Sequence, residues 1–352
     1  MRSFRKTALL LSFLATILVG VSSVQARPHH LFKVASLAPE GSIWATRFND
    51  FAQEVLSKSN GEVGFKAYPG GVMGDDRAMY RKMRIGQLHG GGFTMIGIGE
   101  VVPDFRVLGI PCLFNSYEEV DQLSPKLMPR FQKAFSDKGL VLLALTEVGF
   151  VHTMSTSPLT SLVELKKTRS WVPSGDSLNM IFLDTLGVAP IPLAIPDVLP
   201  ALQTGMLDTV FNSFYGAIVL QWFTRIQYIS DLPFAYAYGA FVLDRGKFSR
   251  LSPEQADIVN NAAEKHFGLL VHDSRKSNKE SLQVLKDNGV KVIAAADGEK
   301  ERLRAFYGTA VQKMTGTVFS REIYEESERL LADIRTQAED KQAKAGTNPA
   351  EK

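Results

Sequence analysis

Residues able to carry catalysis or to hold a metal are few in this chain, and their spacing matches no familiar arrangement. The six histidines are His29, His30, His89, His152, His266 and His272, and none forms the paired helical spacing of a zinc protease. Gly97-Ile98-Gly99 is followed by Val102, where a dinucleotide-binding loop needs a third glycine, and no Gly-x-Ser-x-Gly turn occurs. We therefore expect no metal, no cofactor and no enzymatic activity.

Cys112 is the only cysteine, so the chain cannot form an internal disulfide. It lies in the apolar run GIPCLFN with no histidine or carboxylate close to it in sequence. This context favours a small buried core residue over a reactive thiol.

The N-terminus has the pattern of a cleavable export signal over residues 1–26. Arg2, Arg5 and Lys6 precede an apolar stretch (residues 8–21) that is short for a membrane span, and Ala26 marks the expected cut. An uncleaved anchor is the alternative reading of this segment. Cleavage would reduce the basic residues from 40 to 37, equal to the 37 acidic residues. A neutral chain of this kind argues against nucleic-acid binding, and export predicts a periplasmic protein.

Short apolar runs alternate with amphipathic segments, which predicts an α/β protein. Strands are expected at 31–38, 62–68, 92–96, 140–148, 168–172, 189–193 and 208–212. Helices are expected at 42–57, from Asp75, from Ser116, at 176–186, from Asp197 to Gly205, from Ser252 to about Asp287, and at 320–336. Residues 338–352 are polar and contain Gly and Pro, so we expect a disordered tail.

Several segments in order resemble one family, the solute-binding proteins of tripartite ATP-independent periplasmic (TRAP) transporters, or DctP family. The segments are YPGGVMGDDRAMYRKMRIGQLHGGGF (68–93), FRVLGIPCLFNSYEE (105–119), LKKTRSWVPSG (165–175) and LPALQTGMLD (199–208). Each is weak alone, but their order and spacing are specific. The resemblance covers most of residues 32–244.

The resemblance implies a ligand site in which two expected arginines are replaced. Trp171 stands where the family has a carboxylate-binding arginine, and Val151 replaces the arginine of a Gly-x-Arg segment. Neither side chain can pair with a carboxylate as an arginine fork does. The resemblance therefore implies a ligand other than a typical small dicarboxylate: a neutral or largely apolar compound, or a monoacid held by backbone N–H groups, Asn212 or Arg169.

Other ligand-facing positions follow from the same resemblance. Asn212 corresponds to a ligand-facing asparagine of the family, and Ile195 to a position against the ligand. We also expect Tyr215, Ser174, Phe93 and Thr94 at the site, whereas Trp44 is most simply a core residue. Arg169 is open to two readings, because it could share the pocket face of its strand with Trp171 or stay solvated at the strand edge.

The resemblance further implies a two-lobed periplasmic binding protein fold, with a cleft between lobes and long C-terminal helices. One lobe would contain residues 27–148 and about 238–277, and the other residues 149–237 and about 278–337. Such a protein would be a monomer that closes on a small molecule and delivers it to integral membrane TRAP permease subunits. A periplasmic α/β enzyme and a ligand-presenting sensor protein remain alternatives.

Overall fold

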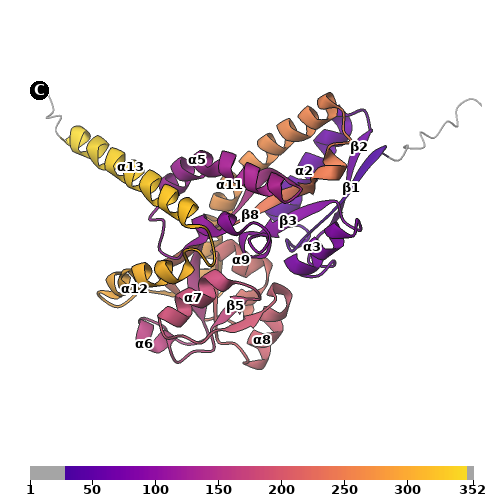
Figure 1. Ribbon diagram of the computed structural model, residues 1–352. Helices are drawn as coiled ribbons and strands as arrows, with labels where there is room; N and C mark the ends of the chain where they lie inside the picture. Colours follow the sequence, from indigo (N-terminus) through magenta and orange to yellow (C-terminus); the bar gives the residue numbers. More distant parts are fainter. Residues whose placement is uncertain (1–27, 347–352) are drawn as a thin grey trace, which may run out of the picture.

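The structure is a computed structural model that describes residues 28–346. The export signal expected at residues 1–26 lies outside the described residues, as does the end of the chain after Gly346. The described part is a mixed α/β fold of two lobes (Figure 1). We call the elements around β1–β3, α2 and α3 the first lobe, and those around β5–β7 and α6–α9 the second lobe.

A seven-stranded sheet forms the centre of the protein. Its strands lie in the order β2 (Val63–Tyr68), β1 (His30–Ser36), β3 (Gly90–Thr94), β8 (Tyr228–Asp244), β4 (Leu140–Ser155) and β7 (Thr209–Asn212), and β9 (Lys291–Ile293) pairs with β8. The pairs β1–β2 and β1–β3 are parallel, whereas β8 runs antiparallel to both β3 and β4. A second sheet of the parallel strands β5 (Trp171–Pro173) and β6 (Ile191–Leu193) belongs to the second lobe.

The long strands β4 and β8 run side by side and connect the two lobes. Their pairing extends from Leu140↔Asp244 to Ser155↔Tyr228, with register shifts on both sides of Gly149. Gly149 has φ of +108°, a backbone conformation that glycine adopts without strain. The strand expected at 140–148 is therefore only half of β4, and β8 was not predicted.

The helices begin largely where local signals place them. They are α2 (Ile43–Lys58), α3 (Asp76–Arg84), α4 (Met95–Ile98), α5 (Tyr117–Asp137), α6 (Leu162–Leu165), α7 (Ser177–Thr185), α8 (Val198–Thr204), α9 (Phe214–Val219), α10 (Arg245–Phe248), α11 (Pro253–Asp287), α12 (Glu299–Met314) and α13 (Arg321–Gly346). The 3-10 turns are η2 (Pro103–Gly109), η3 (Ile195–Asp197) and η4 (Trp222–Thr224). Ser42, Asp75 and Ser252 cap α2, α3 and α11 through their side-chain oxygens, which satisfies backbone N–H groups of the first turn.

The helix α11 connects the lobes a second time, because it packs on α2, on β4 and on α9. A hydrophobic core around Phe51, Phe241 and Phe267 lies where α2 and α11 cover the first-lobe sheet. A separate core around Trp171 and Trp222 lies in the second lobe. Strands β4 and β8 and helix α11 are thus the continuous elements that hold both cores in one molecule.

The C-terminal helix differs from the expectation in length and in place. Helix α13 continues to Gly346, so residues 338–346 are helical and not a disordered tail. The reason is that AEDKQAKA contains only good or tolerated helix formers before the first glycine. The helix packs on α5 and η2 and projects away from the second lobe (Figure 1). Ion pairs Arg335–Glu119 and Arg130–Glu326 join it to α5, a helix of the segment 27–148 that we expected in the other lobe.

Candidate ligand-binding site

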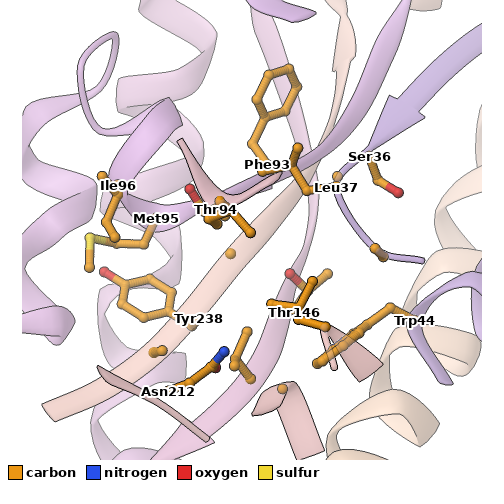
Figure 2. A pocket seen from close by; sticks show the side chains of 18 of the residues that line it. Ser36, Leu37, Trp44, Phe93, Thr94, Met95, Ile96, Thr146, Asn212 and Tyr238 are labelled. Atoms are coloured by element: carbon orange, nitrogen blue, oxygen red, sulfur yellow. The ribbon is translucent and has the colours of Figure 1, made fainter. Parts of the chain in front are cut away.

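A cavity of about 270 Å³ lies between the lobes. Strands β1, β3, β4 and β8 and helix α2 form one wall, and β5, η3, β7 and α9 form the other. Trp44, Thr146, Asn212 and Tyr238 surround the same space from different elements (Figure 2). The site is therefore built from segments far apart in the sequence.

Many aromatic side chains line the walls, and the polar atoms of several of them are bonded to the protein. The indole Nε1 of Trp171 donates to the Leu193 carbonyl at 3.0 Å, and that of Trp44 to the Glu147 carbonyl at 2.9 Å. The Tyr236 hydroxyl donates to Glu147 Oε2 at 2.9 Å. The Tyr238 hydroxyl likewise donates to a backbone carbonyl, that of Phe105. The aromatic residues therefore offer a ligand mainly their apolar surface.

The described residues that line the cavity include no lysine, arginine or histidine. The one acidic lining residue, Glu40, is exposed at the rim. A buried carboxylate of a ligand would find no cationic side chain here. Such an unpaired charge costs several kcal/mol to bury.

Two asparagines supply directed polar groups. Asn212 Oδ1 accepts the Ser213 N–H at 2.8 Å, and its amide nitrogen points into the cavity (Figure 2). Asn179 donates its Nδ2 to Asp176 Oδ2 at 2.6 Å, and its Oδ1 is a buried oxygen without a partner. The cavity thus combines the Asn212 amide nitrogen and the side chain of Thr146 with largely apolar walls.

Buried carboxylates lie directly behind this wall. Asp76 receives hydrogen bonds from the Thr94 hydroxyl (2.5 Å) and the Thr94 N–H (3.2 Å), yet burial raises its pKa to about 7. Burial also raises the pKa of Asp176, which caps α7. The Arg106 guanidinium is buried nearby as well and interacts with Asp176, so the surroundings of the cavity contain groups of both signs.

The two lobes touch at the cleft. The Ile43 N–H of α2 donates to the Tyr215 hydroxyl of α9 at 2.9 Å. Gly175, with φ of +84°, lies against the Arg77–Glu100 ion pair of the first lobe. A Cβ at position 175 would collide with both side chains of this pair. The cavity is therefore covered by contacts between the lobes.

Six of the predicted site residues line the cavity: Trp171, Val151, Asn212, Ile195, Phe93 and Thr94. The other three, Tyr215, Ser174 and Arg169, are not among the residues that line it. Tyr215 packs on Trp44, with 5.1 Å between ring centroids, and serves the contact between lobes. Ser174 donates its backbone N–H to the Leu193 carbonyl. Arg169 pairs with Asp208 at 3.0 Å and is more than half exposed, so it follows the solvated reading.

Sequence reasoning missed Trp44, Thr146, Asn179 and Tyr236, all of which line the cavity. Trp44 was assigned to the core because it lies on an apolar helix face. The sequence gives only a weak sign of Asn179, which lies three residues after Asp176, the cap of α7. In the structure its backbone N–H donates to the Asp176 carboxylate. Tyr236 lies in β8, which was not predicted.

Two further possibilities raised by the sequence, a reactive thiol and a metal site, can be compared with the structure. Burial raises the pKa of the Cys112 thiol to about 11, which disfavours the reactive thiolate. Among residues 28–346, no three His, Cys, Asp or Glu side chains gather as a possible metal site. Over the same residues, no helix has the length and apolar character needed to cross a membrane.

Comparisons with known proteins identify the family. The family model for bacterial extracellular solute-binding protein, family 7 (DctP), matches residues 34–317. The 2,3-diketo-L-gulonate-binding periplasmic protein YiaO of Escherichia coli is 26% identical over 289 residues, covering 79% of this chain and 84% of that protein. The C4-dicarboxylate-binding periplasmic protein DctP of Rhodobacter capsulatus is 22% identical over 258 residues, covering 73% and 76%.

Solved structures show the same fold. The sugar acid binding protein DctPAm of Advenella mimigardefordensis, in complex with galactonate, matches with a TM-score of 0.82 and 20% identity over 88% of this chain and 99% of that chain. A TRAP periplasmic solute binding protein of Desulfovibrio salexigens with bound orotic acid matches with a TM-score of 0.80 and 18% identity, covering 87% and 99%. Together with the family match, these similarities establish that the chain belongs to the DctP family of TRAP solute-binding proteins.

Proposed function

We propose that this protein is a periplasmic receptor that captures a small organic ligand by lobe closure and delivers it to the membrane subunits of a TRAP-type transporter. The observation that carries the proposal is the cavity between the lobes, together with the Ile43–Tyr215 hydrogen bond that joins the lobes. Family membership supports the transport role. We expect the receptor to act as a monomer, without nucleic acid, cofactor or enzymatic turnover.

The lobes would move about the elements that they share. Residues 27–148 and 238–277, together with α13, would move as one body, and residues 149–237 with 278 to about 314 as the other. Gly149 supports this division, because its φ of +108° and the adjacent register shifts interrupt β4 at this boundary. A ligand favours closure to the extent that it binds the closed form more tightly than the open form.

The ligand is not a typical small dicarboxylate under this proposal. The relatives and structures described above are named for sugar acids, C4-dicarboxylates and orotic acid, all of which carry a carboxylate. In this chain Val151 and Trp171 line the cavity where the family pattern has arginines, and none of the lining residues in the described part of the chain is cationic. Trp171 would instead present its apolar indole surface to the ligand.

Small-angle scattering tests closure directly. The protein would be prepared from its own cells with its bound ligand, and a second sample would be unfolded in urea, dialysed and refolded. The ligand-containing sample should have the smaller radius of gyration, and adding the dialysed extract back should restore it. Identical scattering from both samples, despite a bound small molecule in the first, would refute the closure mechanism.

A further inference from the structure

We infer that the ligand carries an extended hydrocarbon chain, which lies along β8 from the space between the lobes toward helix α2. The inference rests on the proposed receptor function and names the ligand class by this chain, whether the polar end is neutral or acidic. Three features of the cavity support it: a row of small residues along β8, an aromatic wall at the end of the row, and accessible surface on the central strands.

Three small residues follow one another on one face of β8. Ala235, Ala237 and Gly239 occupy alternate positions of the strand, and all three line the cavity. β8 continues without a bulge here, because the extra residue at this point of the pairing is Val148 of β4. From Ala235 to Gly239 the strand advances by about 13 Å. The cavity therefore has an elongated floor without large side chains.

The row of small residues faces helix α2. Tyr236 and Tyr238 alternate with these residues and belong to the core on the other face of the strand. Thr146 of β4 shares the face of the row, because its Oγ1 lies 2.8 Å from the position that a Cβ on Gly239 would take. Phe241, two residues after Gly239, belongs to the core that α2 and α11 cover. The row thus leads from the space between the lobes to the inner side of α2.

Aromatic side chains close this end of the row. The ring of Phe241 lies 5.5 Å from that of Phe48 on α2 and 5.0 Å from that of Phe267 on α11, measured between centroids. All three residues line the cavity. Two polar residues, Thr146 and the exposed Asn49, line the cavity nearby. A ligand group at this end contacts mainly hydrocarbon, which favours an apolar group.

Residues of the central strands keep accessible surface along the row. Ala237 of β8 and Thr146 of β4 are half-buried, although both strands have neighbours on each edge. Helix α11 packs against β4, and the Trp44 indole of α2 donates to the Glu147 carbonyl of the same strand. Because Ala237 and Thr146 both line the cavity, their accessible surface is available to a ligand.

The volume of the cavity suits a chain with one polar end. An apolar protein cavity of about 150 Å³ holds benzene, so about 270 Å³ corresponds by proportion to roughly eleven non-hydrogen atoms. Asn212 directs its amide nitrogen into the cavity from the second lobe (Figure 2). A polar end at Asn212 leaves room for a chain of roughly eight carbons along β8.

Two series of probes test the inference, one neutral and one acidic, so that the chain is tested apart from the charge of the polar end. The neutral series is 1-butanol, 1-hexanol and 1-octanol, and the acidic series is butanoate, hexanoate and octanoate. Isothermal titration calorimetry on the protein freed of bound ligand should show affinity rising with chain length in at least one series. Each two methylenes should increase the affinity about tenfold or more.

Variants of the floor and of α2 locate the chain. Ala237→Leu places a larger side chain in the middle of the row, so it should reduce the ratio of octyl to butyl affinity at least tenfold. Ala45→Leu fills the cavity from α2 and should act in the same way, which keeps the test decisive if the first variant does not fold. Ala305→Leu, an exposed change of the same type on α12, should leave the ratio unchanged.

Three results would overturn the inference. They are equal affinities of the butyl and octyl members in both series, no binding by any member, and a wild-type ratio in folded Ala237→Leu or Ala45→Leu protein. Each of them leaves the receptor proposal intact if scattering still shows compaction with the protein's own ligand. A protein that compacts with no small molecule would contradict the receptor proposal itself.

Discussion

Gly149→Ala should destabilise the protein strongly, because Gly149 occupies the point where β4 passes between the lobes. Its φ of +108° strains any residue with a Cβ, at a cost of about 1–3 kcal/mol. The added Cβ would lie 2.7 Å from Asn278 Nδ2 and 2.8 Å from the Tyr117 hydroxyl. These two groups bond the backbone of Val148 and Phe150, on either side of the glycine. Loss of one such hydrogen bond adds about 1 kcal/mol.

The predicted decrease in the free energy of unfolding is therefore about 2–4 kcal/mol, measurable by urea denaturation followed by circular dichroism. Gly268→Ala is the matched control, since Gly268 lies within α11 and has open space where its Cβ would be. There the same substitution should stabilise by about 0.5–1 kcal/mol. A Gly149→Ala variant as stable as wild type would refute the assignment of Gly149 as a required break in β4.

Three further perturbations test the site and its supports. Val151→Arg should raise phenylacetate affinity at least tenfold by calorimetry, because it supplies the missing cation; a folded variant with no gain would contradict the account of acid rejection. Asp76→Asn should flatten the dependence of stability on pH. Between pH 3.8 and about 7 the native Asp76 carboxyl binds more protons than the unfolded one, so the free energy of unfolding of the wild type should fall as pH rises through this window. Equal slopes for the wild type and the variant, measured by urea denaturation at several pH values, would count against this. Arg275→Met should cost about 3–5 kcal/mol in urea denaturation, because it leaves the 2%-exposed Glu147 without its charge partner; an effect as small as that of Lys133→Met, in an exposed pair, would contradict this.

Local signals predicted much of the fold. Capping side chains at Ser42, Asp75 and Ser252 marked the starts of three helices, and Gly205 ends α8 in the left-handed conformation that a glycine allows. These features depend on a few neighbouring residues, so the sequence is sufficient to recognise them. At Ser116 the cap is also present, and the Glu119 carboxylate accepts the Asn115 N–H just before it.

Features that depend on distant contacts were missed. Strand β8 contains Pro233, which reads as a break, and its length is visible only through its pairing with β4. The extension of α13 to Gly346 was missed because we took the polar composition after residue 337 as a sign of a disordered tail. Within the site, the resemblance indicated Trp171, Val151 and Asn212, but not Asn179. Asn179 lies at the cavity beside Asp176, the cap of α7, and this position becomes visible only in the folded chain.

Native mass spectrometry of the protein purified from its own cells tests the central claim most directly, because it weighs whatever occupies the cavity. We predict one bound molecule per chain, of roughly 150 Da if it contains about eleven non-hydrogen atoms. Fragmentation of the released molecule should show a largely apolar compound that does not carry two carboxylic acid groups. A small dicarboxylate as the bound molecule would contradict the account.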